Sequence, residues 1–201
     1  MIRILSLLLA VFMIASCSAI PKIDEDLKSQ LWFEHQIAIT GINVWNLNGR
    51  LGIKNQKNSS TLSFLWEQSY ADYELRFIAP LGQGTYILKN TPEGVVMHDP
   101  KNKTTTVKST DNLFYQALGW KLNINGLKYW IRGIPEPDMS YTELLLDEKG
   151  RLTNMKQSGF NVNVSRYIDQ NGISLPKRLS IKSDDVQLKL VIKKWKTHLD
   201  G

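Results

Sequence analysis

The chain has 201 residues, a formal net charge of +6 and one cysteine. This length suits one domain or one large β domain, and a single cysteine excludes an internal disulfide framework. The positive balance is compatible with nucleic acid, with anionic lipid headgroups, or simply with a lysine-rich surface in water.

The N-terminal residues have the pattern of an export signal. A short start with Arg3 is followed by an apolar run at Ile4–Ile14 and by small residues that end at Cys17. The run is well short of the roughly 20 apolar residues that a transmembrane helix needs. A buried N-terminal helix is the alternative, and the apolar character of the run on all sides disfavours it. Export also argues against a nucleic-acid partner and in favour of anionic lipid headgroups.

Cys17 has the sequence context of a lipidation site. The segment "IASC" at Ile14–Cys17 resembles the bacterial lipobox, whose cysteine is lipidated when the signal is removed. An exported chain with one cysteine cannot use it for an internal disulfide. Ser18 follows, whereas Asp at that place favours retention in the inner membrane, so we expect an anchor on the periplasmic face of the outer membrane. We predict three segments: a signal peptide at 1–16, a lipidated tether at 17–26 and one domain at 27–201.

The first part of the predicted domain is a helix followed by alternating strands. Leu27 and Leu31 lie one helical turn apart in Asp26–Gln36, and Asp24 or Asp26 can cap the helix. The period then changes to two, which is typical of antiparallel strands with one face in water. The residues predicted to point inward are Trp45, Leu47, Leu51, Ile53, Leu62, Phe64, Trp66, Tyr73, Leu75 and Phe77.

The rest of the chain predicts more strands around a helical middle. Three short strands precede two helices, one from Ser109 or Thr110 to Gly119 and one that ends at Gly133 and Pro135. A hairpin that turns at Glu148–Gly150 and three further strands complete the chain. The order is one helix, about six strands, two helices and about five strands. We therefore predict a large, curled antiparallel sheet with a few helices against its apolar side.

The sequence carries no pattern of an active site. The three histidines, His35, His98 and His198, have no metal-ligand spacing, and "GQG" at Gly82–Gly84 lacks the third glycine of a dinucleotide loop. The paired acids Asp147–Glu148 and Asp184–Asp185 each adjoin a predicted turn, where solvated side chains are expected. We predict no catalytic activity, no cofactor and no metal.

The turn in "FIAPLGQG", Phe77–Gly84, places a leucine where polar residues are usual. Leu81 lies between Pro80 and Gly82, with regular strands on both sides. It can fold back onto the core, be one of the scattered leucines that proteins expose, or protrude. A protruding leucine gains about 1.5–3 kcal/mol on leaving water, which would favour dipping the tip into a bilayer.

Four segments in this order resemble the LolB family of outer-membrane lipoprotein receptors. They are Trp45–Ile53, Phe64–Leu88, "LGW" at Leu118–Trp120 and "LKYWIRGIP" at Leu127–Pro135. The region after Gly150 is similar only in its strand pattern. The resemblance implies an incomplete antiparallel β-barrel of about eleven strands with helices over an apolar interior. It also implies a receptor that takes lipoproteins from the periplasmic carrier LolA and places them in the outer membrane.

The resemblance assigns roles to individual residues. Leu81 matches the protruding leucine of the family's "PLG" turn, with Pro80 and Gly82 beside it. Partners would be LolA, lipoprotein acyl chains and outer-membrane phospholipid, and we expect a monomer. The alternatives are a scaffold lipoprotein with a solid core and, without any catalytic signature, a periplasmic hydrolase. The predicted acyl-chain cavity is lined by Trp45, Leu47, Phe64, Trp66, Tyr73, Leu75, Phe77 and Leu88.

Overall fold

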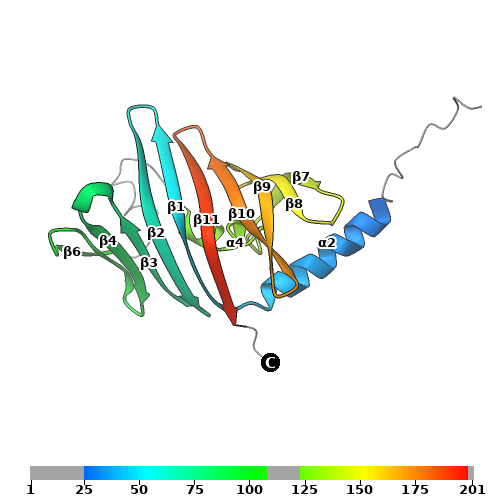
Figure 1. Ribbon diagram of the computed structural model, residues 1–201, viewed down its shortest axis with the longest axis horizontal. Helices are drawn as coiled ribbons and strands as arrows, with labels where there is room; N and C mark the ends of the chain where they lie inside the picture. Colours follow the sequence, from blue (N-terminus) through cyan, green and yellow to red (C-terminus); the bar gives the residue numbers. More distant parts are fainter. Residues whose placement is uncertain (1–24, 108–122, 199–201) are drawn as a thin grey trace, which may run out of the picture.

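A computed structural model describes residues 25–107 and 123–198 of the chain (Figure 1). The helices are α2 (Glu25–Thr40), the one-turn η1 (Pro80–Gly82) and α4 (Ile124–Trp130). The strands before α4 are β1 (Val44–Asn55), β2 (Ser59–Ser69), β3 (Asp72–Ile78), β4 (Thr85–Thr91), β5 (Gly94–His98) and β6 (Thr104–Val107). Those after it are β7 (Tyr141–Leu146), β8 (Leu152–Gln157), β9 (Phe160–Gln170), β10 (Ile173–Lys182) and β11 (Val186–His198).

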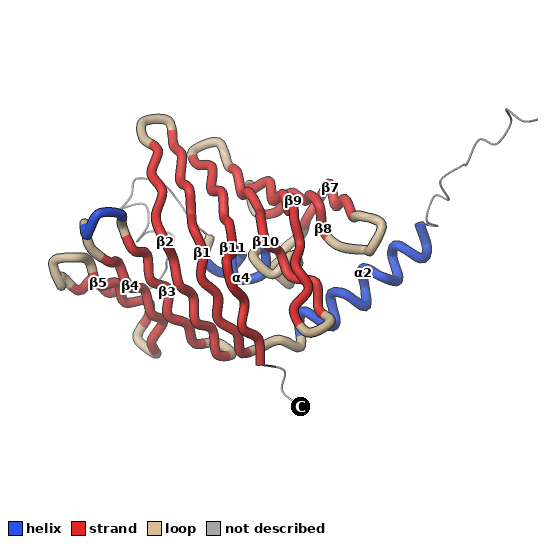
Figure 2. Tube along the Cα trace, in the orientation of Figure 1, coloured by secondary structure: helices blue, strands red, loops and turns tan. Residues whose placement is uncertain are grey.

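All eleven strands form one antiparallel sheet that does not close. Its order is β6-β5-β4-β3-β2-β1-β11-β10-β9-β8-β7, so β6 and β7 are the two edges. The sheet curls around α4, which lies on its concave side, while α2 extends beyond the β7–β10 end (Figures 1 and 2). The predicted fold class and the order of six strands, a helix and five strands are confirmed. The helix predicted between Ser109 and Gly119 lies outside the described residues.

The pairing of β1 with β11 joins the two halves of the sheet. It runs from Val44 opposite His198 to Asn55 opposite Val186, with a bulge after Asn48. Gly49 is required at this bulge, because a Cβ atom there would lie 2.4 Å from the Val191 carbonyl oxygen and 2.8 Å from the Phe64 ring. The two halves therefore share one continuous apolar face.

The helix α2 is longer than predicted, and only Leu31 of the predicted leucine pair lies on the side that packs, where its Cβ faces Gly150. Its buried residues are Trp32 and Ile39, whereas Leu27 is 47% exposed. The helix has apolar side chains on two sides, including the exposed Phe33, so a leucine spacing alone could not identify the face that packs. Asp26 lies inside the helix and is not its cap. Among the described residues, no helix has the length and apolar character needed to cross a membrane.

The helix α4 is fixed at both ends by local contacts. The Asn123 side chain caps it by accepting a hydrogen bond from the Gly126 backbone nitrogen at 2.8 Å. A Cβ atom on Gly126 would lie 2.5 Å from the Trp130 ring, so the glycine lets this ring lie against the helix. The chain leaves the helix through Gly133, whose φ of 82° confirms the predicted stop.

Arg132 ties α4 to the end of α2. It is 4% exposed, and it donates from Nη1 to the carbonyls of Ile39 (3.3 Å) and Ile42 (3.2 Å) and from Nε to the carbonyl of Lys128 (3.0 Å). Burial lowers the pKa of its guanidinium to about 10, so the side chain stays charged at neutral pH. These bonds add a charged donor to the carbonyls at the end of α2, where Ile39 O also accepts a hydrogen bond from the Ile42 backbone nitrogen (3.2 Å).

Arg132→Leu is therefore expected to lower the free energy of unfolding by about 2–3 kcal/mol, because three charge-assisted hydrogen bonds are lost, two to the end of α2 and one to Lys128 of α4. The measurement is chemical denaturation. The matched control is Arg166→Leu, an exposed arginine on β9, which should change stability by less than about 0.5 kcal/mol. Equal effects from both changes would mean that the contacts of Arg132 do not stabilise the junction.

Candidate functional site

Residues predicted to line the interior lie in rows across four strands. Leu47 on β1 pairs with Trp66 on β2, Trp66 with Leu75 on β3, and Leu75 with Leu88 on β4. In a neighbouring row, Phe64 pairs with Phe77. Seven of the eight predicted residues are no more than 8% exposed, and Tyr73 is half-buried. All eight therefore belong to one apolar layer on the concave side of the sheet.

Three tryptophans connect this layer to the C-terminal half of the sheet. The ring centroid of Trp45 lies 5.3 Å from that of Trp66 and 5.6 Å from that of Trp195 on β11. Trp66 Nε1 donates to Gln68 Oε1 at 3.2 Å, and Gln68 in turn donates to the carbonyls of Tyr70 and Asp72. Gln68 was not among the predicted site residues, although it continues the alternation of β2. It provides the acceptor that a buried indole N–H needs.

The helix α4 covers the middle of the apolar layer. Leu127 of α4 approaches Phe64 and Leu75 from the concave side, and the cavity between them has a volume of about 10 Å³. This space accommodates about one water molecule. An acyl chain placed at this point, among the described residues, would therefore need α4 or the side chains beneath it to move. The other residues around this space are Leu51, Trp66, Phe77, Leu188 and Leu190.

The Leu81 side chain points away from the protein. It is 97% exposed, and its backbone has φ 55° and ψ 29°, a left-handed conformation that non-glycine residues rarely adopt. The turn is closed by hydrogen bonds from Ala79 N to Gly84 O (3.0 Å) and from Gln83 N to Pro80 O (3.2 Å). Leu81 thus does not fold back onto the core, which was one of the alternatives.

The turn is braced from one side by the β5–β6 connection. Gly84 has φ 111°, and a Cβ atom there would lie 2.2 Å from Cβ of Pro100. Only glycine allows this approach between the two turns. Pro100 was not predicted to take part, because its contact with Gly84 depends on the pairing of β4 with β5.

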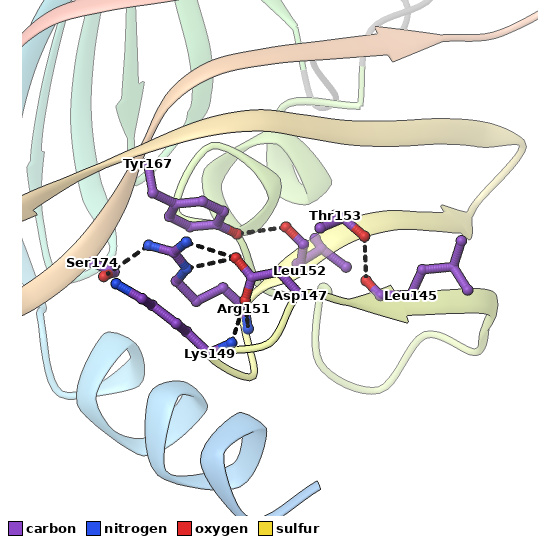
Figure 3. A network of polar contacts seen from close by, with 8 residues as sticks. All are labelled: Leu145, Asp147, Lys149, Arg151, Leu152, Thr153, Tyr167 and Ser174. Carbon is purple, nitrogen blue, oxygen red and sulfur yellow. Dashed lines mark hydrogen bonds and ion pairs between the residues drawn. The ribbon is translucent and has the colours of Figure 1, made fainter. Parts of the chain in front are cut away.

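A polar cluster lies beside α2, at the opposite end of the sheet from the Leu81 turn (Figure 3). Asp147 forms an ion pair with Arg151 (2.6 Å) and accepts hydrogen bonds from the backbone nitrogens of Lys149 and Arg151. The Arg151 guanidinium lies 4.5 Å from the centre of the Tyr167 ring. The Asp147–Glu148 pair lies in the β7–β8 turn as predicted, but only Glu148 is exposed, because Asp147 is partly buried and ion-paired rather than solvated.

This cluster supports the packing of α2. A Cβ atom on Gly150 would lie 2.5 Å from the backbone nitrogen of Trp32, so the turn packs tightly on α2. The His35 ring on α2 lies edge-on to the Tyr167 ring, with 6.2 Å between the two ring centroids. The Nε2 atom of His35 is buried without a hydrogen-bond partner. Within the described ranges, no three metal-ligating side chains come together.

The environment of His35 predicts a pH dependence of stability. Burial, and then the charge of Arg151, lower its pKa from 6.5 to about 4, while Asp147 acts in the opposite sense. Between these values the unfolded chain binds more protons than the native state, so stability falls as the pH falls from 6.5 to 4 and this contribution then levels off. The expected loss is about 1–2 kcal/mol, because His35 is only partly buried.

His35→Leu should remove this component from a denaturation series measured between pH 7 and pH 4. Gln36→Leu, the same kind of change at a neighbouring residue that does not titrate, should keep the wild-type pH dependence. A wild-type slope in His35→Leu would assign the effect to other groups.

The fold places this chain in a structural class. An open antiparallel sheet of this kind is shared with a LolA superfamily protein from Nitrosomonas europaea, with a TM-score of 0.53, 8% identity, and coverage of 85% of this chain and 93% of that chain. It is also shared with a DUF1329 family protein from Desulfovibrio piger ATCC 29098, with a TM-score of 0.51, 8% identity, and coverage of 88% and 94%. The chain therefore has the LolA-type fold, and at these identities the likeness shows the fold alone.

Sequence similarity then identifies the family. Residues 43–195 match the family model described as "Outer membrane lipoprotein LolB". The chain is 35% identical over 164 residues to the outer-membrane lipoprotein LolB of Pseudomonas syringae pv. syringae (strain B728a), covering 82% of this chain and 80% of that protein. It is 34% identical over 166 residues to the protein of the same name from Pseudomonas putida (strain ATCC 700007 / DSM 6899 / JCM 31910 / BCRC 17059 / LMG 24140 / F1), covering 83% and 80%. The chain belongs to the LolB family of outer-membrane lipoproteins, and the resemblance inferred from its motifs is confirmed.

Proposed function

We propose that this outer-membrane lipoprotein accepts lipoproteins from the periplasmic carrier LolA and inserts them into the outer membrane by passing their acyl chains through its apolar interior. The observation that carries the proposal is the exposed Leu81, held on a braced turn at the end of two strands, β3 and β4, whose inner faces belong to the apolar layer. The turn would meet the membrane, and the layer would hold the chains.

The energetics of acyl chains explain why such a receptor is needed. Each buried CH₂ contributes about 0.8 kcal/mol, so exposing one chain to water costs on the order of 10 kcal/mol. Several chains together would exceed the limit of about 20 kcal/mol for non-covalent affinity. Transfer without a protein cavity would thus be too slow. Since ATP is not expected outside the cytoplasm, each acceptor must bind the chains more tightly than the donor before it.

The small space beneath α4 fits a receptor that is closed before it is loaded. Leu127 and the side chains that it contacts would move apart to admit a chain, exchanging contacts among apolar side chains for contacts with CH₂ groups. Such an exchange exposes no apolar surface to water, so its net cost is small compared with that of a solvated chain.

The decisive experiment is a transfer assay. LolA loaded with a radiolabelled lipoprotein is mixed with this protein in a form that lacks its anchor, and the cargo bound to each protein is measured. Cargo is expected to move from LolA to the receptor and then, on addition of liposomes, into lipid. If both proteins are folded and no cargo moves, the proposal is wrong.

A scaffold lipoprotein that binds an assembly partner is the second candidate, because the described interior is closely packed around α4. An environment-sensitive apolar dye distinguishes the two. Saturable binding of the dye, with competition by lipoprotein, would support the receptor, and the absence of saturable binding would support the scaffold.

Cys17 lies outside the described residues, and its lipidation remains a proposal. Cys17→Ala, exported with a cleavable signal, is expected to give a soluble periplasmic protein that still takes cargo from LolA, because the predicted tether at 17–26 is separate from the strands of the apolar layer. Cell fractionation and the transfer assay test both points. Loss of uptake by a folded, soluble form would show that the anchor takes part in receiving cargo.

A further inference from the structure

Three turns lie side by side at the end of the strands where Leu81 is found. They are the β1–β2 turn, the η1 turn between β3 and β4, and the β5–β6 turn. Because neighbouring strands are antiparallel, these alternate connections are at the same end of the strands. Figure 2 shows the three turns following one another at this end of the strands, with η1 between the other two.

Lysines flank Leu81 on both sides. Lys54 and Lys57 lie at the β1–β2 turn, and Lys101 and Lys103 at the β5–β6 turn. All four are exposed, and none forms an ion pair with another described residue. We call these four residues the lysine edge.

Negative charge at the lysine edge is small. The acidic residue in these three turns is Asp99, whose Oδ1 accepts hydrogen bonds from the backbone nitrogens of Lys101 (2.8 Å) and Lys103 (2.9 Å). In the β1–β2 turn the same role belongs to a neutral side chain, because Asn55 Oδ1 accepts from the backbone nitrogens of Lys57 (2.9 Å) and Asn58 (2.6 Å). The edge thus has a net positive charge, carried on turns that are internally hydrogen-bonded.

The positions of these lysines relative to Leu81 are fixed by packing. On one side, the close approach of Gly84 to Pro100 holds the β5–β6 turn against the η1 turn. On the other side, the pairing of Ser63 with Ile78 holds the β1–β2 hairpin beside the strand that leads into η1. The turns that carry the lysines and the turn that carries Leu81 therefore lie at the same end of the strands, with the β1–β2 turn extending beyond the other two (Figure 2).

We propose that the lysine edge binds the headgroups of anionic phospholipids and so presents Leu81 to the acyl region of the membrane. This inference rests on the membrane step of the proposed function. A single exposed leucine among separate lysines fits a fluid layer of headgroups, which can adjust to each cation, whereas protein interfaces are usually depleted of lysine and bury a contiguous apolar centre. Each lysine near an anionic surface contributes about fivefold in affinity, the equivalent of about 1 kcal/mol.

The test is binding of the mature-length chain with Cys17→Ala to vesicles, so that no acyl anchor contributes. One set of vesicles is phosphatidylcholine alone and the other contains phosphatidylglycerol. Lys54, Lys57, Lys101 and Lys103 are changed together to Gln. The control changes Lys149, Lys193, Lys194 and Lys196 to Gln, which removes the same charge from exposed residues at the opposite end of the strands.

The lysine-edge variant is expected to lose roughly several hundredfold in affinity for the anionic vesicles, and the control less than about threefold. Raising the salt concentration should weaken wild-type binding and have little effect on the lysine-edge variant. Equal losses in the two variants would mean that net charge alone attracts the protein, and would overturn the proposal. The proposal would also be overturned if the lysine-edge variant bound vesicles as tightly as the wild type but no longer took up cargo from LolA. The lysine edge would then contact the carrier and not the membrane.

The proposed function and the role of the lysine edge are tested by different assays. If the wild-type protein moves no cargo between LolA and liposomes, the proposed function is wrong, whatever the vesicle affinities are. If it moves cargo and the lysine-edge variant binds anionic vesicles as the wild type does, only the lysine edge is wrong.

Discussion

Leu81→Glu is expected to block the release of cargo into membranes while uptake from LolA stays close to wild type. Burying the leucine contributes about 1.5–3 kcal/mol, and a carboxylate in the acyl region would be unfavourable by a similar amount. The affinity of the tip for the bilayer should therefore fall by about 3–5 kcal/mol, which slows the second step at least about a hundredfold. The side chain is 97% exposed, so the change removes no packing contact from the fold.

The experiment scores carrier-to-receptor transfer and receptor-to-liposome transfer separately. The matched control is Leu145→Glu, the same change at a leucine that is 58% exposed on β7, at the far edge of the sheet from β4. This control should release cargo normally. If Leu81→Glu abolishes the first step, or leaves the second at the wild-type rate, the turn does not have this role.

Leu81→Gly separates the cost of the backbone from the role of the side chain. Glycine adopts the left-handed conformation of residue 81 without strain, so the variant should be at least as stable as the wild type but still slow in release. A leucine kept in an unfavourable conformation and away from the core contributes little to folding, which fits a role outside the fold.

The periodicity of the sequence was sufficient to predict the strands and their inner faces, because an antiparallel sheet with one wet face gives a strict alternation. Phe64, Trp66 and Leu75 were placed on the correct side for this reason. The turn at Leu81 was also predictable, since Pro80 and Gly82 restrict the backbone on both sides of it.

Contacts between distant segments could not be derived from periodicity. The β1–β11 pairing joins strands at opposite ends of the chain. Arg132 was read only as part of a motif, because a sequence does not show that a guanidinium will meet the carbonyls of Ile39 and Ile42. Two glutamines, Gln68 and Gln157, are buried because each accepts a hydrogen bond from a tryptophan indole.

The burial of the residues predicted to line the interior supports the fold but does not identify the function. Burial of Trp45 and Leu47 is expected of any curled sheet, so it does not distinguish a receptor from a scaffold. The distinction depends on whether charge placed in the layer stops cargo uptake in a protein that still folds.

Phe64→Glu and Leu75→Glu are expected to reduce uptake of cargo from LolA at least tenfold, because a carboxylate in the apolar layer is costly to bury beside acyl chains. The alternation of β3 places Glu74 on its outer face, but Glu74 does not suit a control, since it is partly buried and paired with Arg76 and Lys89. Thr61→Glu is the matched control, because it introduces the same charge on the exposed side of the strand that carries Phe64 and should alter stability by about half a kcal/mol or less.

The inward variants can lose several kcal/mol of stability, so uptake is expressed per folded molecule, with the folded fraction measured by near-ultraviolet circular dichroism. Leu75→Asn, a neutral and smaller change at the same position, provides a variant that is expected to remain folded and to lose uptake in part. The expected order of uptake is wild type and Thr61→Glu, then Leu75→Asn, then the two glutamate variants. Equal uptake by inward and outward variants at the same folded fraction would mean that the acyl chains do not pass through this layer, since a buried carboxylate could not remain without effect on chains that contact it.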